Sequence, residues 1–261
     1  MVRPIFLAVD GKKRMVEVMD TIAVAMDGPI GPYMAGVKLN DAVHIVGGGP
    51  TLVGAVLAKY SDLGVCLDFK MADVSATDAN IIGHYAEDAD RLLTTVSVHS
   101  SVKTFVELLE KYPKIEVIAM GVPTDMPTEE CVSRYGLPPA DAMRKWYGIL
   151  AKDFRSAIGQ HDGPDNILPT ALAVMSFDMI GAMCKTFPGL GAFTPGIRDD
   201  WMAQDHQVRK TGIAAALKLG ARYVVMGAQL TKGNPDAGID ATKSQELTAA
   251  EIEKFYASQK V

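Results

Sequence analysis

The sequence lacks the features of several protein classes that are easily recognised. Its 261 residues include only three cysteines, Cys66, Cys131 and Cys184, and none of them belongs to a Cys-x-x-Cys pair. An odd number of scattered cysteines favours reduced thiols over a disulfide framework. No group of His, Cys and Asp residues has the spacing of a metal site, so we expect no bound metal.

Long hydrophobic runs and an excess of positive charge are also missing. No stretch reaches the roughly 18 apolar residues that indicate a membrane span. The N-terminal sequence MVRPIFLAVD contains neither a long apolar region nor a small-residue cleavage site. The net charge is −5, whereas nucleic-acid-binding modules usually carry a clustered basic face. We therefore expect a cytoplasmic protein that binds neither membranes nor nucleic acid.

What the sequence does contain is a regular series of short apolar runs. Segments with the apolar spacing of helices, at 12–26, 51–60, 104–112 and 213–220, separate several of these runs. Buried parallel strands are nearly continuous apolar runs, and their alternation with helices indicates βα crossovers. The expected strands are residues 5–10, 35–40, 64–70, 92–100, 115–121, 169–175, 191–197 and 222–228.

Eight such units in a chain of this length predict an α/β protein with a single (β/α)₈ barrel domain over residues 1–261. A doubly wound open sheet is the rival fold, but no GxGxxG sequence follows the first strand, which removes its main indicator. Residues 122–168 depart from the regular spacing and include a predicted helix at 140–158. We interpret this segment as an elaborated fifth βα unit.

Polar residues collect where the expected strands end. In a barrel of this kind the carboxyl ends of all strands lie on one rim, and catalytic groups lie there. We therefore expect these end residues to share one site. They are Asp10, Lys38, Asn40, Asp68, Lys70, His99, Thr124, Thr194 to Ile197, and Gly227 to Gln229.

The segment LDFKMADVSATD (67–78) concentrates these charges. Side chains alternate along a strand, so Asp68 and Lys70 are expected on one face. Asp10 and Lys38 can approach them from neighbouring strands, giving two ammonium groups that alternate with two carboxylates and keep all four ionised. The alternative is structural: a stabilising Asp68–Lys70 ion pair, with Asp10 as a helix cap. His99 is interpreted as a hydrogen-bonded polar residue rather than a ligand.

The segment Asp68 to Thr77 resembles the DxKxxDxxxT signature of orotidine 5′-phosphate decarboxylases. Other segments resemble further motifs of that family in the same order along most of the chain. They are LAVD in the first strand, GVK in the second, TPGIR (194–198) and DHQVR (205–209) in the seventh unit, and MGAQLTKGNP (226–235) in the eighth.

The resemblance implies decarboxylation of orotidine 5′-monophosphate to uridine 5′-monophosphate in pyrimidine biosynthesis, by a homodimer that needs no cofactor. Lys70 would protonate a carbanion at the ring carbon, Asp68 would face the substrate carboxylate, and Lys38 would hold the ribose and Asp68. Asp73 and Thr77 would reach the partner's active site. The remaining substrate-binding residues would be Asp10 at the ribose, Thr124 at the pyrimidine edge, Pro195 in the seventh loop, Gln207 on a phosphate-gripping loop, and Gly227 and Ala228 at the phosphate.

One departure from the family concerns the phosphate. The family usually has an arginine where this chain has Ala228, and Gln229, Lys232, Arg198 or Arg209 are candidates to replace it. Two alternative functions stay open. One is a related sugar-phosphate decarboxylase or aldolase, a branch in which Glu typically stands at the position of Lys38. The other is a non-catalytic nucleotide-binding homologue.

Overall fold

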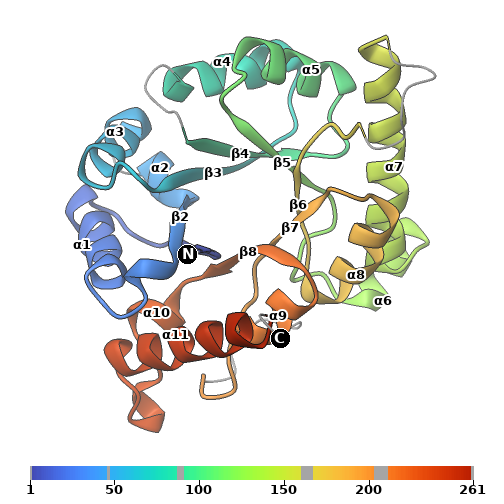
Figure 1. Ribbon diagram of the computed structural model, residues 1–261. Helices are drawn as coiled ribbons and strands as arrows, with labels where there is room; N and C mark the ends of the chain where they lie inside the picture. Colours follow the sequence, from blue (N-terminus) through green and yellow to red (C-terminus); the bar gives the residue numbers. More distant parts are fainter. Residues whose placement is uncertain (1, 46–47, 87–90, 160–166, 203–210, 260–261) are drawn as a thin grey trace.

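The computed structural model describes residues 2–45, 48–86, 91–159, 167–202 and 211–259. These residues form a closed barrel of parallel strands in the order β1 to β8, with helices around the outside (Figure 1). The predicted single-domain (β/α)₈ fold is confirmed. The strands are Ile5–Val9 (β1), Met34–Leu39 (β2), Gly64–Met71 (β3), Leu92–Ser97 (β4), Glu116–Met120 (β5), Leu172–Val174 (β6), Gly191–Thr194 (β7) and Ala221–Met226 (β8).

The long helices around the barrel each bury an apolar face. In α7, for example, Met143, Tyr147 and Leu150 are buried at helical spacing. No helix in the described ranges is long and apolar enough to cross a membrane. The helices are Met15–Met26 (α1), Asp41–Ile45 (α2), Gly49–Lys59 (α3), Ser75–Ala86 (α4), Val102–Lys111 (α5), Thr128–Tyr135 (α6), Pro139–Ala157 (α7), Phe177–Thr186 (α8), Ile213–Lys218 (α9), Ala228–Thr231 (α10) and Ala241–Ser258 (α11).

The segment expected as an elaborated fifth unit holds two helices, α6 and α7, between β5 and β6. Figure 1 shows α7 packed along the outside of the barrel beside α8. The aromatic rings of Tyr135 and Trp146, from these two helices, meet edge to face at 4.7 Å. His99, from the segment after β4, meets the same Trp146 ring edge to face at 4.3 Å.

Apolar side chains close the lower part of the barrel. A buried layer joins residues from seven strands, and Phe6 and Phe193 meet within it edge to face at 5.1 Å. Because side chains alternate, residues two positions further along these strands face the carboxyl-end mouth. The layer consists of Phe6, Cys66, Leu93, Ile118, Leu172, Phe193 and Val225.

A close approach of β1, β2 and β3 aligns the strands that carry the charged residues. A Cβ added to Gly36 would lie 2.3 Å from the Gly64 carbonyl oxygen and 2.5 Å from the Phe6 ring, so only glycine fits there. The pairing of β1 with β2 shifts at the same level, and Lys38 then lies opposite Ala8 and Cys66. This register brings Lys38 between Asp10 and Asp68 at the mouth of the barrel.

Candidate active site

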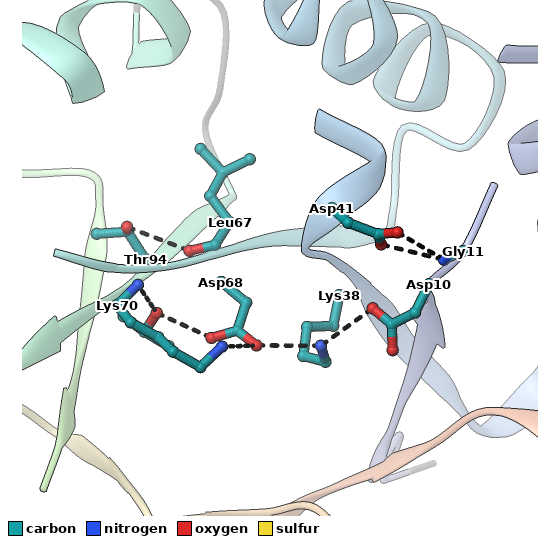
Figure 2. Close-up of polar contacts among 9 residues, drawn as sticks. Asp10, Gly11, Lys38, Asp41, Leu67, Asp68, Lys70 and Thr94 are labelled. Carbon is teal, nitrogen blue, oxygen red and sulfur yellow. Dashed lines mark hydrogen bonds and ion pairs between the residues drawn. The ribbon is translucent and has the colours of Figure 1, made fainter. Parts of the chain in front are cut away.

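Four charged side chains form an alternating row across the mouth of the barrel (Figure 2). Lys38 Nζ lies 3.1 Å from Asp68 Oδ2 and 3.5 Å from Asp10 Oδ1. Lys70 Nζ lies 2.8 Å from the same Asp68 Oδ2. The order is therefore Asp10, Lys38, Asp68, Lys70, with each charge next to one of opposite sign, as the sequence predicts.

Burial and charge act in opposite directions on the inner pair of this row. The Lys38 residue is only 8% exposed, and burial alone would lower the pKa of its ammonium. The carboxylates of Asp68 and Asp10 outweigh burial and raise the Lys38 pKa above its ordinary value. Burial likewise opposes ionisation of Asp68, but Lys38 and Lys70 lower the pKa of its carboxyl below the ordinary value. Both groups are therefore held in their charged forms.

The backbone at Lys70 is not that of a regular strand. Lys70 has φ +53°, a left-handed conformation that costs a residue with a side chain about 1 to 2 kcal/mol. The pairing of β3 with β4 also shifts between Leu67 and Met71. Asp68 and Lys70 do meet as predicted, but simple alternation along the strand is the wrong reason. The irregular backbone lets Lys70 fold back onto Asp68.

Thr95 is a site residue that the sequence did not single out. Its hydroxyl donates a hydrogen bond to Asp68 Oδ1 at 3.0 Å and accepts one from the Lys70 backbone N–H at 2.8 Å. The Thr95 side chain thus fixes both the Asp68 carboxylate and the left-handed backbone of Lys70. The LLTTVS segment contains two adjacent threonines, and only the strand register shows that Thr95 faces the site.

Asp68 and Lys70 lie in the wall of a cavity of about 210 Å³, here called the central compartment. Met120, Val174 and Phe193 contribute apolar walls, and Thr124 lies at its edge. A flat, weakly polar ring suits such a space, because the apolar walls exclude water while the charged row lies on one side. The predicted substrate-binding residues Thr124 and Pro195 both line it.

A second cavity of about 360 Å³ adjoins the first and is called the rim compartment. The two share Lys38, Pro195 and Val225 in their walls. The predicted residues Asp10, Gly227 and Ala228 line the rim compartment, together with Lys12, Arg198 and Lys232. An elongated ligand could therefore extend from Lys70 across the Asp10–Lys38 pair to the ends of β7 and β8.

One candidate for the missing arginine is excluded by its position. Gln229 is fully buried, and its side chain is bonded to Asp199 and Thr248 on the outer side of the barrel. Its carbonyl oxygen also accepts from the Asp199 backbone N–H at 3.0 Å. Gln229 therefore supports the loop after β7 and does not reach the rim compartment. Gln207 and Arg209 lie outside the described residues.

Asp73 and Thr77 do not line either compartment of their own chain. Asp73 is exposed at the edge of a separate groove of about 650 Å³ between α2, β3 and α4, which also borders Lys70. Thr77 lies in the first turn of α4, where its N–H donates to the Val74 carbonyl oxygen at 2.9 Å. Their expected role in a partner's site stays a prediction.

His99 and the cysteines have no place in the charged row. The His99 ring lies against Trp146, and burial lowers the pKa of its imidazole below the ordinary value. Among the residues placed by the structure, no three His, Cys, Asp or Glu side chains are grouped so that they could hold a metal ion. The expected absence of a metal and of a cofactor stays a prediction.

No protein-family model matches the chain. A curated protein from Thermobifida fusca (strain YX), named orotidine 5′-phosphate decarboxylase, is 27% identical over 250 residues, which are 91% of this chain and 97% of that protein. The chain is similar in sequence to this orotidine 5′-phosphate decarboxylase. This match along nearly the whole of both chains confirms the resemblance that the motifs predict.

Solved structures of orotidine 5′-monophosphate decarboxylases and of a 3-keto-L-gulonate-6-phosphate decarboxylase share the barrel. Orotidine 5′-monophosphate decarboxylase from Methanocaldococcus jannaschii, crystallised with the inhibitor BMP, has a TM-score of 0.64 at 15% identity, covering 96% of this chain and 99% of that one. The 3-keto-L-gulonate-6-phosphate decarboxylase from Vibrio cholerae has a TM-score of 0.57 at 12% identity, covering 98% and 99%. At these identities the likeness establishes the common fold.

Proposed function

We propose that this protein decarboxylates orotidine 5′-monophosphate to uridine 5′-monophosphate without a cofactor. The observation that carries the proposal is the row Asp10, Lys38, Asp68 and Lys70, placed beside an apolar compartment of a size that suits a single ring. The relationship to proteins named orotidine 5′-phosphate decarboxylase supports the same substrate.

The reaction places negative charge on a ring carbon. The bond between that carbon and the carboxylate breaks, CO₂ leaves, and the bonding electron pair stays on the ring. The Lys70 ammonium then donates a proton to the carbon, which forms the C–H bond of the product and leaves a neutral amine. The Lys70 side chain is 45% exposed in the single chain, so water can return the proton after product release.

The contribution of the protein is electrostatic preorganisation. An ammonium that is fixed before reaction stabilises developing negative charge more effectively than water, because no dipoles need to reorient. Asp68 holds Lys70 Nζ at 2.8 Å, and Thr95 holds the Lys70 backbone. Both oxygens of Asp68 accept hydrogen bonds, so the carboxylate has one fixed orientation. Lys38 supports that orientation from the opposite side.

The two compartments suit the two ends of a nucleotide. The base would occupy the central compartment, the ribose would lie over the Asp10–Lys38 pair, and the 5′-phosphate would enter the rim compartment. Asp10 is about half exposed, so its second carboxylate oxygen is open to a ribose hydroxyl. Binding energy gained at the phosphate is remote from the reacting carbon and can be used to position the ring and exclude water.

A homodimer is part of the proposal, because apolar side chains are exposed in and next to the groove beside Lys70. Val74 is 67% exposed and Ile81 is 36% exposed, and both belong to the segment that carries Asp73. A second copy packed on this face would cover these side chains. It would also bring Asp73 of the partner subunit toward Lys70, whose side chain is 45% exposed in the single chain.

The direct test is an assay with orotidine 5′-monophosphate on protein dialysed against a chelator. We expect the ultraviolet absorbance of the substrate to fall and uridine 5′-monophosphate to accumulate in equal amount. A protein that binds uridine 5′-monophosphate but turns over no substrate would support a binding role instead. Metal-dependent turnover of 3-keto-L-gulonate 6-phosphate, with none of orotidine 5′-monophosphate, would assign the chain to the sugar-phosphate branch.

A further inference from the structure

The rim compartment has a strong imbalance of charge. Lys12, Arg198 and Lys232 contribute positive charges to its wall, and among the residues that the structure describes only Asp10 contributes a carboxylate there. That carboxylate already has Lys38 at 3.5 Å. Loops after the seventh and eighth strands of such barrels often bind phosphate groups. The compartment is therefore arranged for an anion with more than one negative charge.

Lys12 lies on a segment that is anchored on both sides. The Gly11 N–H donates to both oxygens of Asp41, at 2.9 and 3.1 Å, as Figure 2 shows. The Lys13 N–H donates to Glu17 Oε2 at 3.0 Å. Gly11 has φ +73°, which favours glycine and turns the chain after β1. Lys12 thus projects from a fixed backbone, and its side chain is half-buried in the wall of the compartment.

Lys232 faces the same space from a second fixed segment. Its N–H donates to the Ala228 carbonyl oxygen at 2.8 Å, directly after α10. The next residue, Gly233, has φ +69° and packs against the backbone of Ile239 and Asp240, where a Cβ would approach within 2.6 Å. Figure 1 shows α10 beside α1, so the two lysines come from neighbouring elements of the barrel rim.

The other side chains near Ala228 are less suited to this task. Gln229 is buried and bonded elsewhere. Arg198 lines the compartment, but its Nη1 donates to the Ile197 carbonyl oxygen at 3.0 Å. Within the described ranges, neither Lys12 nor Lys232 has a carboxylate at ion-pair distance, so both ammonium groups are open to a ligand.

We propose that Lys12 and Lys232 together grip the phosphate group of the nucleotide, in place of a single arginine at position 228. The inference rests on the proposed function for the identity of the nucleotide, and on the rim compartment for the site. Arg198 adds positive charge at the side of the grip. An ammonium is a point charge without the bidentate geometry of a guanidinium. The grip therefore depends on charge more than on exact orientation.

The experiment measures binding of three ligands by calorimetry: uridine 5′-monophosphate, uridine and ribose 5-phosphate. The variants are Lys12→Ala, Lys232→Ala and their combination, with Lys13→Ala as the matched control. Lys13 is the exposed neighbour of Lys12 and does not line the compartment. A further variant adds Ala228→Arg to the double variant, because Ala228 lines the compartment and an arginine there can extend into it.

We expect each lysine variant to bind uridine 5′-monophosphate about tenfold more weakly, which corresponds to losing one charge-assisted contact. Uridine affinity should stay unchanged, Lys13→Ala should behave as wild type, and Ala228→Arg should restore part of the lost affinity. Added salt should weaken phosphate binding less in the double variant than in wild type.

The inference is overturned if the double variant binds uridine 5′-monophosphate as tightly as wild type does. It is also overturned if wild type binds neither phosphorylated ligand. If ribose 5-phosphate binds through the two lysines while uridine 5′-monophosphate does not bind and orotidine 5′-monophosphate is not consumed, the two-lysine grip stands and the proposed function fails.

Discussion

Thr95 holds Lys70 and Asp68 in one arrangement: its hydroxyl accepts from the Lys70 N–H at 2.8 Å and donates to Asp68 Oδ1 at 3.0 Å. Lys70 itself has φ +53°. The side chain that would carry the chemistry thus projects from an unfavourable backbone that a neighbouring strand holds in place. Local strain of this kind is often found where a side chain must be positioned against its preference.

The left-handed backbone predicts an unusual order of stability for two variants. Lys70→Gly should be about 1 kcal/mol more stable than Lys70→Ala, because glycine adopts this conformation without steric cost. Both variants lose the same ion pair, so that loss cancels in the comparison. Urea unfolding measures the difference. At Lys152, exposed within α7, the order should reverse, since alanine is the better helix former by about 1 kcal/mol. If alanine were more stable than glycine at both Lys70 and Lys152, the strained backbone at Lys70 would be refuted.

Thr95 should act as a positioning residue. Thr95→Val keeps the shape of the side chain but removes both hydrogen bonds, so we expect kcat to fall by about 10- to 100-fold. KM and the affinity for uridine 5′-monophosphate should change little, because Thr95 acts through Asp68 and Lys70. Thr95→Ser should recover most of the rate. A rate loss in Thr95→Ser as large as in Thr95→Val would show that the hydroxyl is not what matters.

The buried pair of Lys38 and Asp68 should contribute to stability only while both are charged. Asp68→Asn leaves Lys38 buried without its nearer partner and should cost about 3 kcal/mol near neutral pH. Lys38→Met combined with Asp68→Asn should recover much of that cost, because the uncompensated charge is then gone. Urea unfolding of wild type, Asp68→Asn, Lys38→Met and the double variant forms the cycle that measures the coupling.

The sign of the pH dependence follows from the directions of the two pKa shifts. The folded Asp68 pKa is lowered, so its contribution is present above the unfolded value of about 4 and is lost as pH falls through the folded value. The folded Lys38 pKa is raised, so its contribution is present below about 10.5 and is lost as pH rises through the folded value. The difference in free energy of unfolding between wild type and Asp68→Asn should therefore be constant from about pH 5 to 9. It should shrink as the pH falls below about 5. A difference that grows on acidification would contradict this assignment.

If Asp73 completes the partner's site, two inactive variants should complement each other. Lys70→Ala and Asp73→Ala dimers each have two defective sites, whereas a mixed dimer has one intact site. After subunit exchange at equal concentration, about half of the dimers are mixed, and about a quarter of wild-type activity should return. Native mass spectrometry checks that exchange has occurred. Mixed dimers without activity would place Asp73 outside the partner's site.

The barrel and its charged row could be predicted because they depend on local patterns. Apolar runs at regular spacing indicate the strands, and Asp10, Lys38 and Asp68 each stand at or near a strand end. In a closed parallel barrel, the carboxyl ends of all strands lie on one rim, whatever the exact strand register. The motif around Asp68 also indicates the resemblance to orotidine 5′-phosphate decarboxylases without any knowledge of the contacts.

The features that the sequence did not show depend on register and on distant contacts. Which of Thr94 and Thr95 faces the site follows from the pairing of β4 with its neighbours. Gln229 stands next to Ala228 but turns outward, because α10 begins at Ala228. The backbone beside Lys12 is fixed by the hydrogen bonds from the Gly11 N–H to Asp41, which lies beyond α1 and β2 at the start of α2. None of these relationships has a periodicity that a single sequence would reveal.

Whether the Lys70 ammonium beside Asp68 protonates the ring carbon is measured most directly by comparing wild type with Lys70→Ala. Single-turnover decarboxylation of orotidine 5′-monophosphate is followed in chelator, with uridine 5′-monophosphate affinity and circular dichroism as checks on binding and folding. We expect conversion by wild type and a rate at least about 10⁴-fold lower for the variant, with its fold and ligand binding intact. Decarboxylation by Lys70→Ala at a rate close to that of wild type would contradict this expectation.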